Sequence, residues 1–167
     1  MSAAALLEKK IGILFVCMGN ICRSPTAEAV FRHLVRQAGL EHLIECDSAG
    51  THDYHIGEPP DERAQHAALR RGYDMSGLRG RQVGSQDFVQ FDYVLAMDGH
   101  NLALLARICP SQHAHKLSLY CDFHERYAGQ EVPDPYYGGA QGFERVLDMI
   151  EQISASLLER LRQLSRV

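Results

Sequence analysis

Segments with the apolar pattern of buried strands alternate along this chain with segments whose apolar residues recur at the period of a helix. Residues 11–16 form a short continuous apolar run, which is typical of a strand that is buried on both faces. Residues 91–97 form a second apolar run of similar length. Shorter strand patterns lie at residues 44–48 and 116–120. The pattern therefore predicts four short strands.

Helical periodicity occupies the intervals between these strands. An apolar stripe between residues 27 and 38 predicts the first helix. Pro25 suits the first helical position, because its missing N–H needs no partner there, and Ser24 can act as the N-cap before it. Gly39 is a typical stop signal for this helix.

The remaining helices show the same periodicity. Residues 61–71 and 101–108 carry helical patterns that end at Gly72 and Pro110. The final segment has the clearest apolar stripe, which fits a helix packed on a sheet better than a coiled coil. The stripe consists of Phe143, Val146, Leu147, Ile150, Ile153, Leu157, Leu158, Leu161 and Leu164.

The alternation of strands and helices predicts a parallel sheet with helices on both faces. Ligands of such sheets bind beyond the carboxyl ends of the strands. A length of 167 residues fits one domain. We expect this domain to span residues 11–167, after an Ala-rich, flexible leader at residues 1–10.

Charge and cysteine content narrow the possible partners and the compartment. The formal net charge is −4, which argues against nucleic acid and anionic membranes as main partners. No apolar run approaches the length of a transmembrane helix, so no membrane insertion is expected. The odd count of five cysteines favours a reducing compartment, and a cytoplasmic location is expected.

The most informative segment follows the first strand, at its carboxyl end. Five residues separate Cys17 from Arg23, and the segment continues directly into the first helix. Backbone N–H groups of a tight loop, together with a helix N-terminus, can surround a phosphate dianion. The same positive field favours the thiolate form of Cys17. The segment therefore predicts attack of a thiolate on phosphorus.

Two further residue types support this interpretation of the loop. Gly19 is expected to permit backbone angles that a side chain would resist. Arg23 can bind two phosphoryl oxygens at once through its planar guanidinium. The predicted phosphate-binding loop comprises Cys17, Met18, Gly19, Asn20, Ile21, Cys22, Arg23 and Ser24.

A second segment supplies a candidate acid. Asp134 lies between two prolines, which hold it on a stiff loop, as suits a general acid that protonates a leaving phenolate or alkoxide. Taken alone, Pro-Asp-Pro more often marks a simple turn, but the Cys17 loop favours the catalytic interpretation. Tyr136 and Tyr137 can form walls of a substrate pocket and stack on an aromatic ring.

Both segments resemble the low-molecular-weight protein tyrosine phosphatases. The resemblance rests on residues 17–25 and 134–137, and residues 47–51 and 91–98 agree with it, so it covers nearly the whole chain. It implies a flavodoxin-like three-layer α/β sandwich, whose central four-stranded parallel sheet has the order 2-1-3-4 with helices on both faces. It also implies hydrolysis of phosphotyrosine through a phosphocysteine intermediate, without metal or cofactor.

The resemblance implies roles for individual residues of the two segments. Cys17 is the expected nucleophile, and Arg23 is the expected phosphate clamp. Asp134 is expected to act as the acid of the first step and the base of the second. The hydroxyl of Ser24 is expected to stabilise the thiolate, and Cys22 to form a reversible disulfide with oxidised Cys17.

Residues outside the two segments are expected to complete the site. Asn20 is expected to hold the loop in shape with help from Ser48. Ile21 and Tyr54 are expected to line the substrate pocket. Many family members carry a supporting histidine where this chain has Leu78, so Asn20 is expected to make fewer bonds here.

The resemblance also indicates the partners. Phosphate and other oxyanions are expected in the loop, and the expected substrate is a phosphotyrosine protein, with a tyrosine kinase as one candidate. A metal site is not expected. The pairs His52 and His55, and His113 and His115, lack cysteine or carboxylate partners at metal-binding spacing, so they are better interpreted as solvated loop histidines.

Three other functions compete with this interpretation. An arsenate reductase has a similar loop but needs further cysteines close to the first, and Cys109 and Cys121 are far from it in sequence. A protein-arginine phosphatase tends to carry threonine at the position of Ile21. A catalytically silent phosphate-binding module would need neither the thiol of Cys17 nor the acid Asp134.

Overall fold

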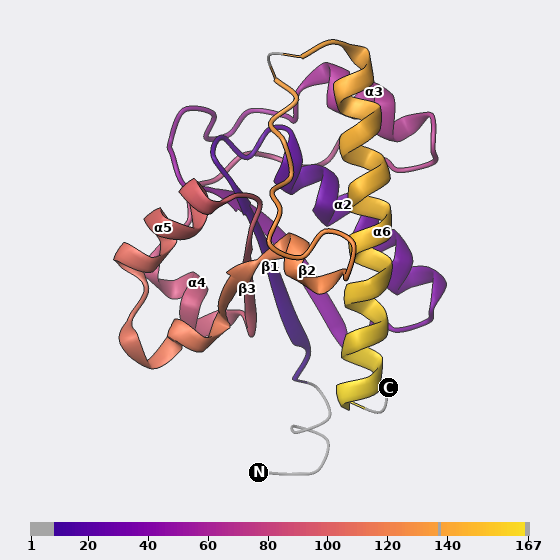
Figure 1. The fold of residues 1–167 in the computed structure, drawn as a ribbon. Helices are drawn as coiled ribbons and strands as arrows, with labels where there is room; N and C mark the ends of the chain where they lie inside the picture. Colours follow the sequence, from indigo (N-terminus) through magenta and orange to yellow (C-terminus); the bar gives the residue numbers. More distant parts are fainter. Residues whose placement is uncertain (1–8, 137, 166–167) are drawn as a thin grey trace.

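The computed structural model describes residues 9–136 and 138–165 of the chain (Figure 1). The expected leader at residues 1–10 lies almost wholly outside the described residues, and so does Tyr137. Strands and helices alternate through most of the described chain. None of the helices in this part of the chain is long and apolar enough to cross a membrane.

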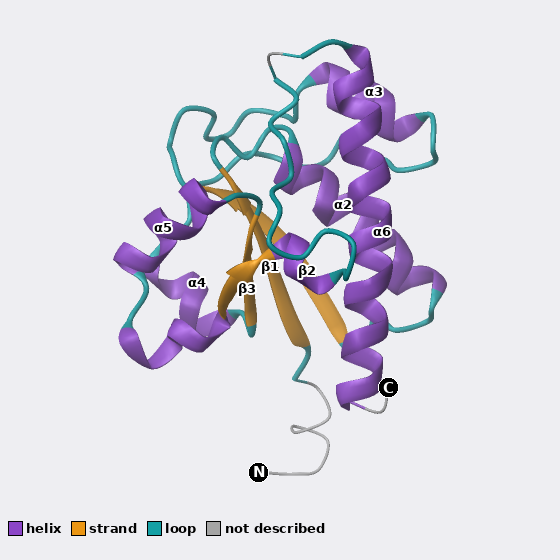
Figure 2. Cartoon of the chain, in the orientation of Figure 1, coloured by secondary structure: helices purple, strands orange, loops and turns teal. Residues whose placement is uncertain are grey.

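Four parallel strands form the sheet at the centre of the molecule (Figure 2). They are β1 (Ile11–Cys17), β2 (Ile44–Gly50), β3 (Tyr93–Ala96) and β4 (Leu117–Leu119). Their order is β2-β1-β3-β4, which confirms the predicted topology. Cys17 is in register with Gly50, and Val16 with Ala96, so the carboxyl ends of three strands meet at one edge.

Helices cover both faces of this sheet. They are α2 (Arg23–Gln37), α3 (Glu62–Leu69), α4 (Ser85–Gln90), α5 (Gly99–Ile108) and α6 (Ala140–Ser165), with two 3-10 turns, η1 (Ser111–Lys116) and η2 (Tyr120–Phe123). Helices α2, α3 and α6 lie on one face, and α4 and α5 lie on the other (Figure 1). The predicted three-layer α/β sandwich is therefore confirmed.

Each face of the sheet has its own hydrophobic core, because successive residues of β1 point to opposite faces. On the α2 and α6 side, the ring of Phe15 lies 5.7 Å from that of Phe31 and 5.5 Å from that of Tyr120. On the other side, Leu14 and Val16 pack in the smaller core. Each large side chain buried in this way stabilises the fold by about 1.5–3 kcal/mol. The two cores hold β1 from both sides and so fix the position of Cys17 at its end.

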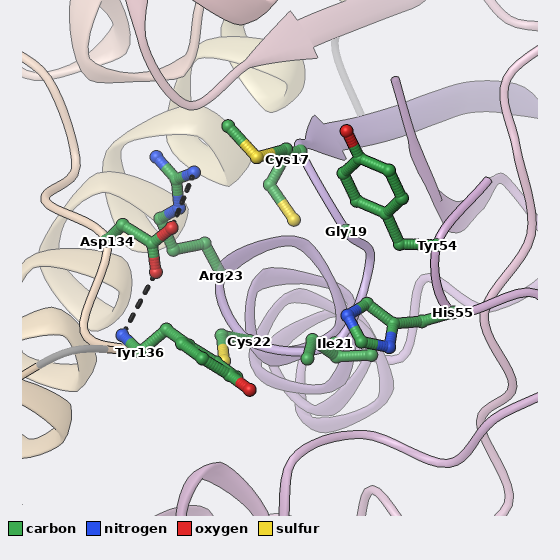
Figure 3. A pocket seen from close by; sticks show the side chains of 10 residues that line it. Cys17, Gly19, Ile21, Cys22, Arg23, Tyr54, His55, Asp134 and Tyr136 are labelled. Atoms are coloured by element: carbon green, nitrogen blue, oxygen red, sulfur yellow. Dashed lines mark hydrogen bonds and ion pairs between the residues drawn. The ribbon is translucent and has the colours of Figure 1, made fainter. Parts of the chain in front are cut away.

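Helix α2 begins earlier than the sequence pattern predicted. Its first residue is Arg23 and its N-cap is Cys22, so Ser24 is not the cap and Pro25 is the third helical residue. No side chain caps this end, over which the preceding loop lies (Figure 3). The first-turn N–H groups therefore face the loop, as an anion site requires.

Two other differences concern short or terminal segments. The six residues of α4 were not predicted, since one and a half turns are too short to show a helical period. Leu164 was predicted on the buried stripe of α6, but it is 69% exposed because it lies in the last turn of the helix.

Candidate active site

The segment after β1 forms a tight loop over the N-terminal end of α2 (Figure 3). The backbone N–H of Asn20 donates to the sulfur of Cys17 at 3.3 Å, and Asn20 takes a left-handed conformation with φ +57°. The hydroxyl of Ser24 lies 3.0 Å from the same sulfur. Cys17 is almost completely buried, with 3% of its surface exposed. These contacts surround the sulfur with groups that can donate to a thiolate.

Gly19 does not have the backbone conformation that the sequence predicted. Its φ is not positive, and the one residue of the loop with a positive φ is Asn20. A Cβ on Gly19 would instead lie 3.0 Å from Cδ2 of His55, whose ring packs over the loop. Gly50 is constrained in a similar way, since a Cβ there would lie 2.8 Å from the carbonyl oxygen of Met18. The backbone of the Cys17 loop therefore excludes a side chain at Gly50, whereas a side chain at Gly19 would require the His55 ring to shift.

The side chain of Asn20 holds the loop through three hydrogen bonds. Its Nδ2 donates to Oγ of Ser24 at 2.8 Å and to Oγ of Ser48 at 3.0 Å. Its Oδ1 accepts a bond from the backbone N–H of Arg81 at 3.0 Å. Leu78, which stands at the position of the family histidine, packs against the hydrophobic core. The Arg81 backbone and Ser48 support Asn20 without that histidine.

A buried carboxylate lies behind this network. The hydroxyl of Ser48 donates to Oε1 of Glu28 at 2.7 Å, and Arg32 pairs with the other carboxylate oxygen. Burial raises the pKa of Glu28, although the bonds from Ser48 and the charge of Arg32 oppose that shift. A chain of hydrogen bonds thus runs from Glu28 through Ser48, Asn20 and Ser24 to the sulfur of Cys17.

Arg23 is buried and held by three groups. Its Nη1 donates to Oδ2 of Asp98 at 2.7 Å and to the carbonyl oxygen of Val132 at 3.0 Å. Its Nη2 lies 3.6 Å from Oδ2 of Asp134. Burial acts to lower the pKa of Arg23, but the charges of Cys17 and Asp98 outweigh it and raise the pKa, so the guanidinium stays charged.

The loop forms the floor of a cavity of about 260 Å³. Asp134 and Tyr136 stand on one side of it, and Tyr54 and His55 stand on the other (Figure 3). Asp134 reaches this position because the backbone N–H of Tyr136 donates to its Oδ1 at 3.0 Å. The residues that line the cavity are Cys17, Met18, Gly19, Ile21, Cys22, Arg23, Tyr54, His55, Asp134 and Tyr136. Tyr137, the other predicted wall residue, lies outside the described residues.

The other cysteines have different environments. Burial, followed by the charge of Asp61, raises the pKa of the Cys22 thiol far above its ordinary value, so this residue stays a neutral thiol beside Cys17. Burial raises the pKa of Cys46 to about 12 and that of Cys121 to about 11. Cys109 packs against the smaller core, on the opposite face of the sheet from Cys121.

The histidine pairs do not form a metal site in the part of the chain that the structure describes. No group of three or more His, Cys, Asp or Glu side chains with metal-binding geometry occurs there. His52 stacks on the ring of Tyr54 at 4.9 Å, and His113 and His115 lie in η1. Nδ1 of His55 lies 2.6 Å from Oε2 of Glu58.

Sequence reasoning missed two residues at the site, His55 and Asp98. His55 was interpreted as a solvated loop residue, but it lines the cavity. Because His55 is far from Cys17 along the chain, no local pattern indicated that both residues line the same cavity. Asp98 lies two residues after the end of β3, at the same sheet edge as Cys17, and this position was a usable signal.

Comparisons with known proteins agree with this geometry. The family model described as low molecular weight phosphotyrosine protein phosphatase matches residues 12–166. The low molecular weight protein-tyrosine-phosphatase YfkJ of Bacillus subtilis is 44% identical over 151 residues, which cover 88% of this chain and 96% of that protein. The human low molecular weight phosphotyrosine protein phosphatase is 41% identical over 151 residues, which cover 89% and 94%.

Solved structures show the same similarity. A crystal structure of a protein tyrosine phosphatase from Entamoeba histolytica, with Hepes in its active site, matches with a TM-score of 0.89. It is 42% identical, and the match covers 93% of this chain and 99% of that chain. This protein therefore belongs to the low molecular weight phosphotyrosine protein phosphatase family.

Proposed function

We propose that this protein hydrolyses phosphotyrosine in protein substrates, through a phosphocysteine intermediate on Cys17. One observation carries the proposal: a thiol, a guanidinium and a carboxyl group, from Cys17, Arg23 and Asp134, converge on one cavity floored by the loop. A module that only binds phosphate would need neither the thiol nor the acid. The family assignment supports the same reaction.

In the first step, the thiolate of Cys17 attacks phosphorus and the bond between phosphorus and the tyrosine oxygen breaks. The loop N–H groups and the guanidinium of Arg23 stabilise the charge on the phosphoryl oxygens. Oδ2 of Asp134 lies 3.6 Å from Nη2 of Arg23, which places the carboxyl group beside the phosphate position. Asp134 donates its proton to the leaving phenolate.

In the second step, water attacks phosphorus and the bond to the sulfur of Cys17 breaks. Asp134, now ionised, accepts the proton of this water, and inorganic phosphate leaves. The departing thiolate is stabilised by the N–H of Asn20 and the hydroxyl of Ser24, which lie 3.3 Å and 3.0 Å from the sulfur. The same two contacts therefore assist both steps.

The shape of the cavity favours an aryl phosphate. The phosphate site lies at the floor, and the aromatic side chains of Tyr54 and Tyr136 stand at its walls (Figure 3). A phosphotyrosine ring can bridge that depth and pack between the walls, with Ile21 as a further apolar contact. A phosphoserine is short and would draw its backbone into the cavity.

The proposal also covers the protein substrate, the cellular location and the sensitivity to oxidation. A phosphorylated tyrosine kinase is one candidate substrate, since such enzymes carry phosphotyrosine themselves. A cytoplasmic location fits the free thiols of the described cysteines, which a reducing compartment would preserve. Oxidation of Cys17 would block turnover, so the enzyme is expected to be redox-sensitive.

The rival reactions are less well supported. An arsenate reductase needs a relay of cysteines, and Cys22 is the one other cysteine among the residues that line the cavity. The apolar side chain of Ile21 favours an apolar aromatic ring over the polar guanidinium of phosphoarginine.

Steady-state kinetics on phosphotyrosine, phosphoserine, phosphoarginine and arsenate, measured side by side, test the proposal. The highest kcat/KM is expected for phosphotyrosine. Comparable values for phosphoserine, a higher value for phosphoarginine, or thiol-dependent arsenate reduction at a competitive rate would each contradict it.

A further inference from the structure

The start of α3 is bonded directly to the phosphate-binding loop. The backbone N–H of Asp61, the N-cap of α3, donates to the carbonyl oxygen of Ile21 at 2.8 Å. The carboxylate of Asp61 in turn binds Arg63 in a fork, with Nε at 3.1 Å from Oδ1 and Nη2 at 2.9 Å from Oδ2. The guanidinium of Arg63 is therefore linked to the loop through Asp61.

The same guanidinium lies against two aromatic rings. Its carbon is 5.3 Å from the ring centre of Tyr136 and 4.9 Å from that of Phe143. Phe143 is buried at the start of α6, whereas Tyr136 stands at the wall of the catalytic cavity. Arg63 therefore connects the loop floor, through Asp61, with one aromatic wall of the cavity.

We infer that Arg63 is a positioning residue, which sets the distance of the Tyr136 ring from the phosphate-binding loop and thereby favours aryl over alkyl phosphates. The inference rests on the proposed function. Arg63 is not among the residues that line the cavity, so it acts through Tyr136 and not on the substrate. The charge of Arg63 matters because it attracts the ring of Tyr136. Its planar shape matters because the fork to Asp61 needs a planar group.

The test is the ratio of kcat/KM for an aryl phosphate to kcat/KM for a small alkyl phosphate. Arg63→Met keeps much of the side-chain stem but removes the charge and the fork. It should raise KM for the aryl phosphate about two- to fivefold, with a smaller change in kcat and little change for the alkyl phosphate. Arg63→Lys, which keeps the charge, should recover part of the ratio and provides a second variant if Arg63→Met folds poorly.

A double-mutant cycle separates this role from a general effect on stability. Tyr136→Ala should lower the ratio by itself, and adding Arg63→Met should lower it no further. Arg70→Met is the matched control. Arg70 is the C-cap of the same helix α3, and its Nη2 lies 2.5 Å from Oε1 of Glu144 in α6. It does not line the catalytic cavity. It should leave the ratio unchanged.

The possible results distinguish this inference from the proposed function. Equal losses for aryl and alkyl phosphates in Arg63→Met, or independent effects of Arg63→Met and Tyr136→Ala, would overturn the positioning role while phosphotyrosine hydrolysis stands. Absence of phosphotyrosine hydrolysis by the wild-type protein would overturn both.

Discussion

Asp98 binds Arg23 with one carboxylate oxygen and caps α5 with the other. Oδ2 accepts the bond from Nη1 of Arg23 at 2.7 Å, and Oδ1 accepts a bond from the backbone N–H of Asn101 at 2.7 Å. The side chain of Asp98 therefore links the α5 N-terminus to the guanidinium of Arg23, the proposed phosphate clamp. Because Asp98 lies two residues after the end of β3, the orientation of Arg23 is tied to the central sheet.

Asp98→Asn separates these two functions. Asparagine is as good an N-cap as aspartate, so the cap of α5 should be kept and any loss of stability should come from the ion pair with Arg23. The charge-assisted bond to Arg23 is lost, and such bonds are worth about 1.5–3 kcal/mol. The inhibition constant of inorganic phosphate should therefore rise about tenfold or more. An unchanged inhibition constant would show that Arg23 is oriented without Asp98.

Asp134→Ala tests the general acid. The variant should lower kcat about 10²–10⁴-fold for esters with poor leaving groups, because protonation of the leaving oxygen is lost. The loss in kcat/KM should shrink for esters whose leaving groups are strongly acidic. A loss of equal size across a series of leaving-group pKa values would indicate that Asp134 has only a structural role.

Peroxide treatment tests the redox role of Cys22. A buried, neutral thiol beside an oxidised Cys17 can close a disulfide, and both residues line the same cavity. Mass spectrometry after brief peroxide treatment should find Cys17 linked to Cys22, and a dithiol reagent should restore activity. Sulfinic acid on Cys17 with Cys22 still free would count against this role.

Glu28→Gln should change the pH dependence of stability. Burial raises the pKa of Glu28 above its ordinary value of 4.5, so the native state binds this proton more tightly than the unfolded state. The stabilisation is fully present below the ordinary pKa and is lost as pH rises through the raised pKa. In urea unfolding, the free energy of unfolding of the wild-type protein should fall relative to that of Glu28→Gln as pH rises from about 4.5 through the raised pKa. A relative increase with pH would contradict the shift.

The sequence alone was sufficient for the local features of the protein. Apolar runs predicted two of the strands, and shorter patterns predicted the other two. The Cys17 segment and Asp134 were each recognisable within a few residues. Arg63 was missed because its partner Tyr136 lies more than 70 residues away along the chain. Asp98 was also missed, although its place near the carboxyl end of β3 could have indicated it. The reason for Gly19 was also wrong, since the packing of His55 against it exists only in the folded protein. Contacts between distant segments have no local pattern by which to find them.

The most direct test of the central claim is to trap the intermediate. Wild-type protein is mixed rapidly with a phosphotyrosine peptide, quenched under denaturing conditions and digested, and the phosphoryl group is located by mass spectrometry. The mechanism predicts phosphorylation of the peptide that contains Cys17, and neither trapped phosphate nor turnover in Cys17→Ser, which should still bind inorganic phosphate. Turnover without phosphorylated Cys17, or clear activity in Cys17→Ser, would contradict it.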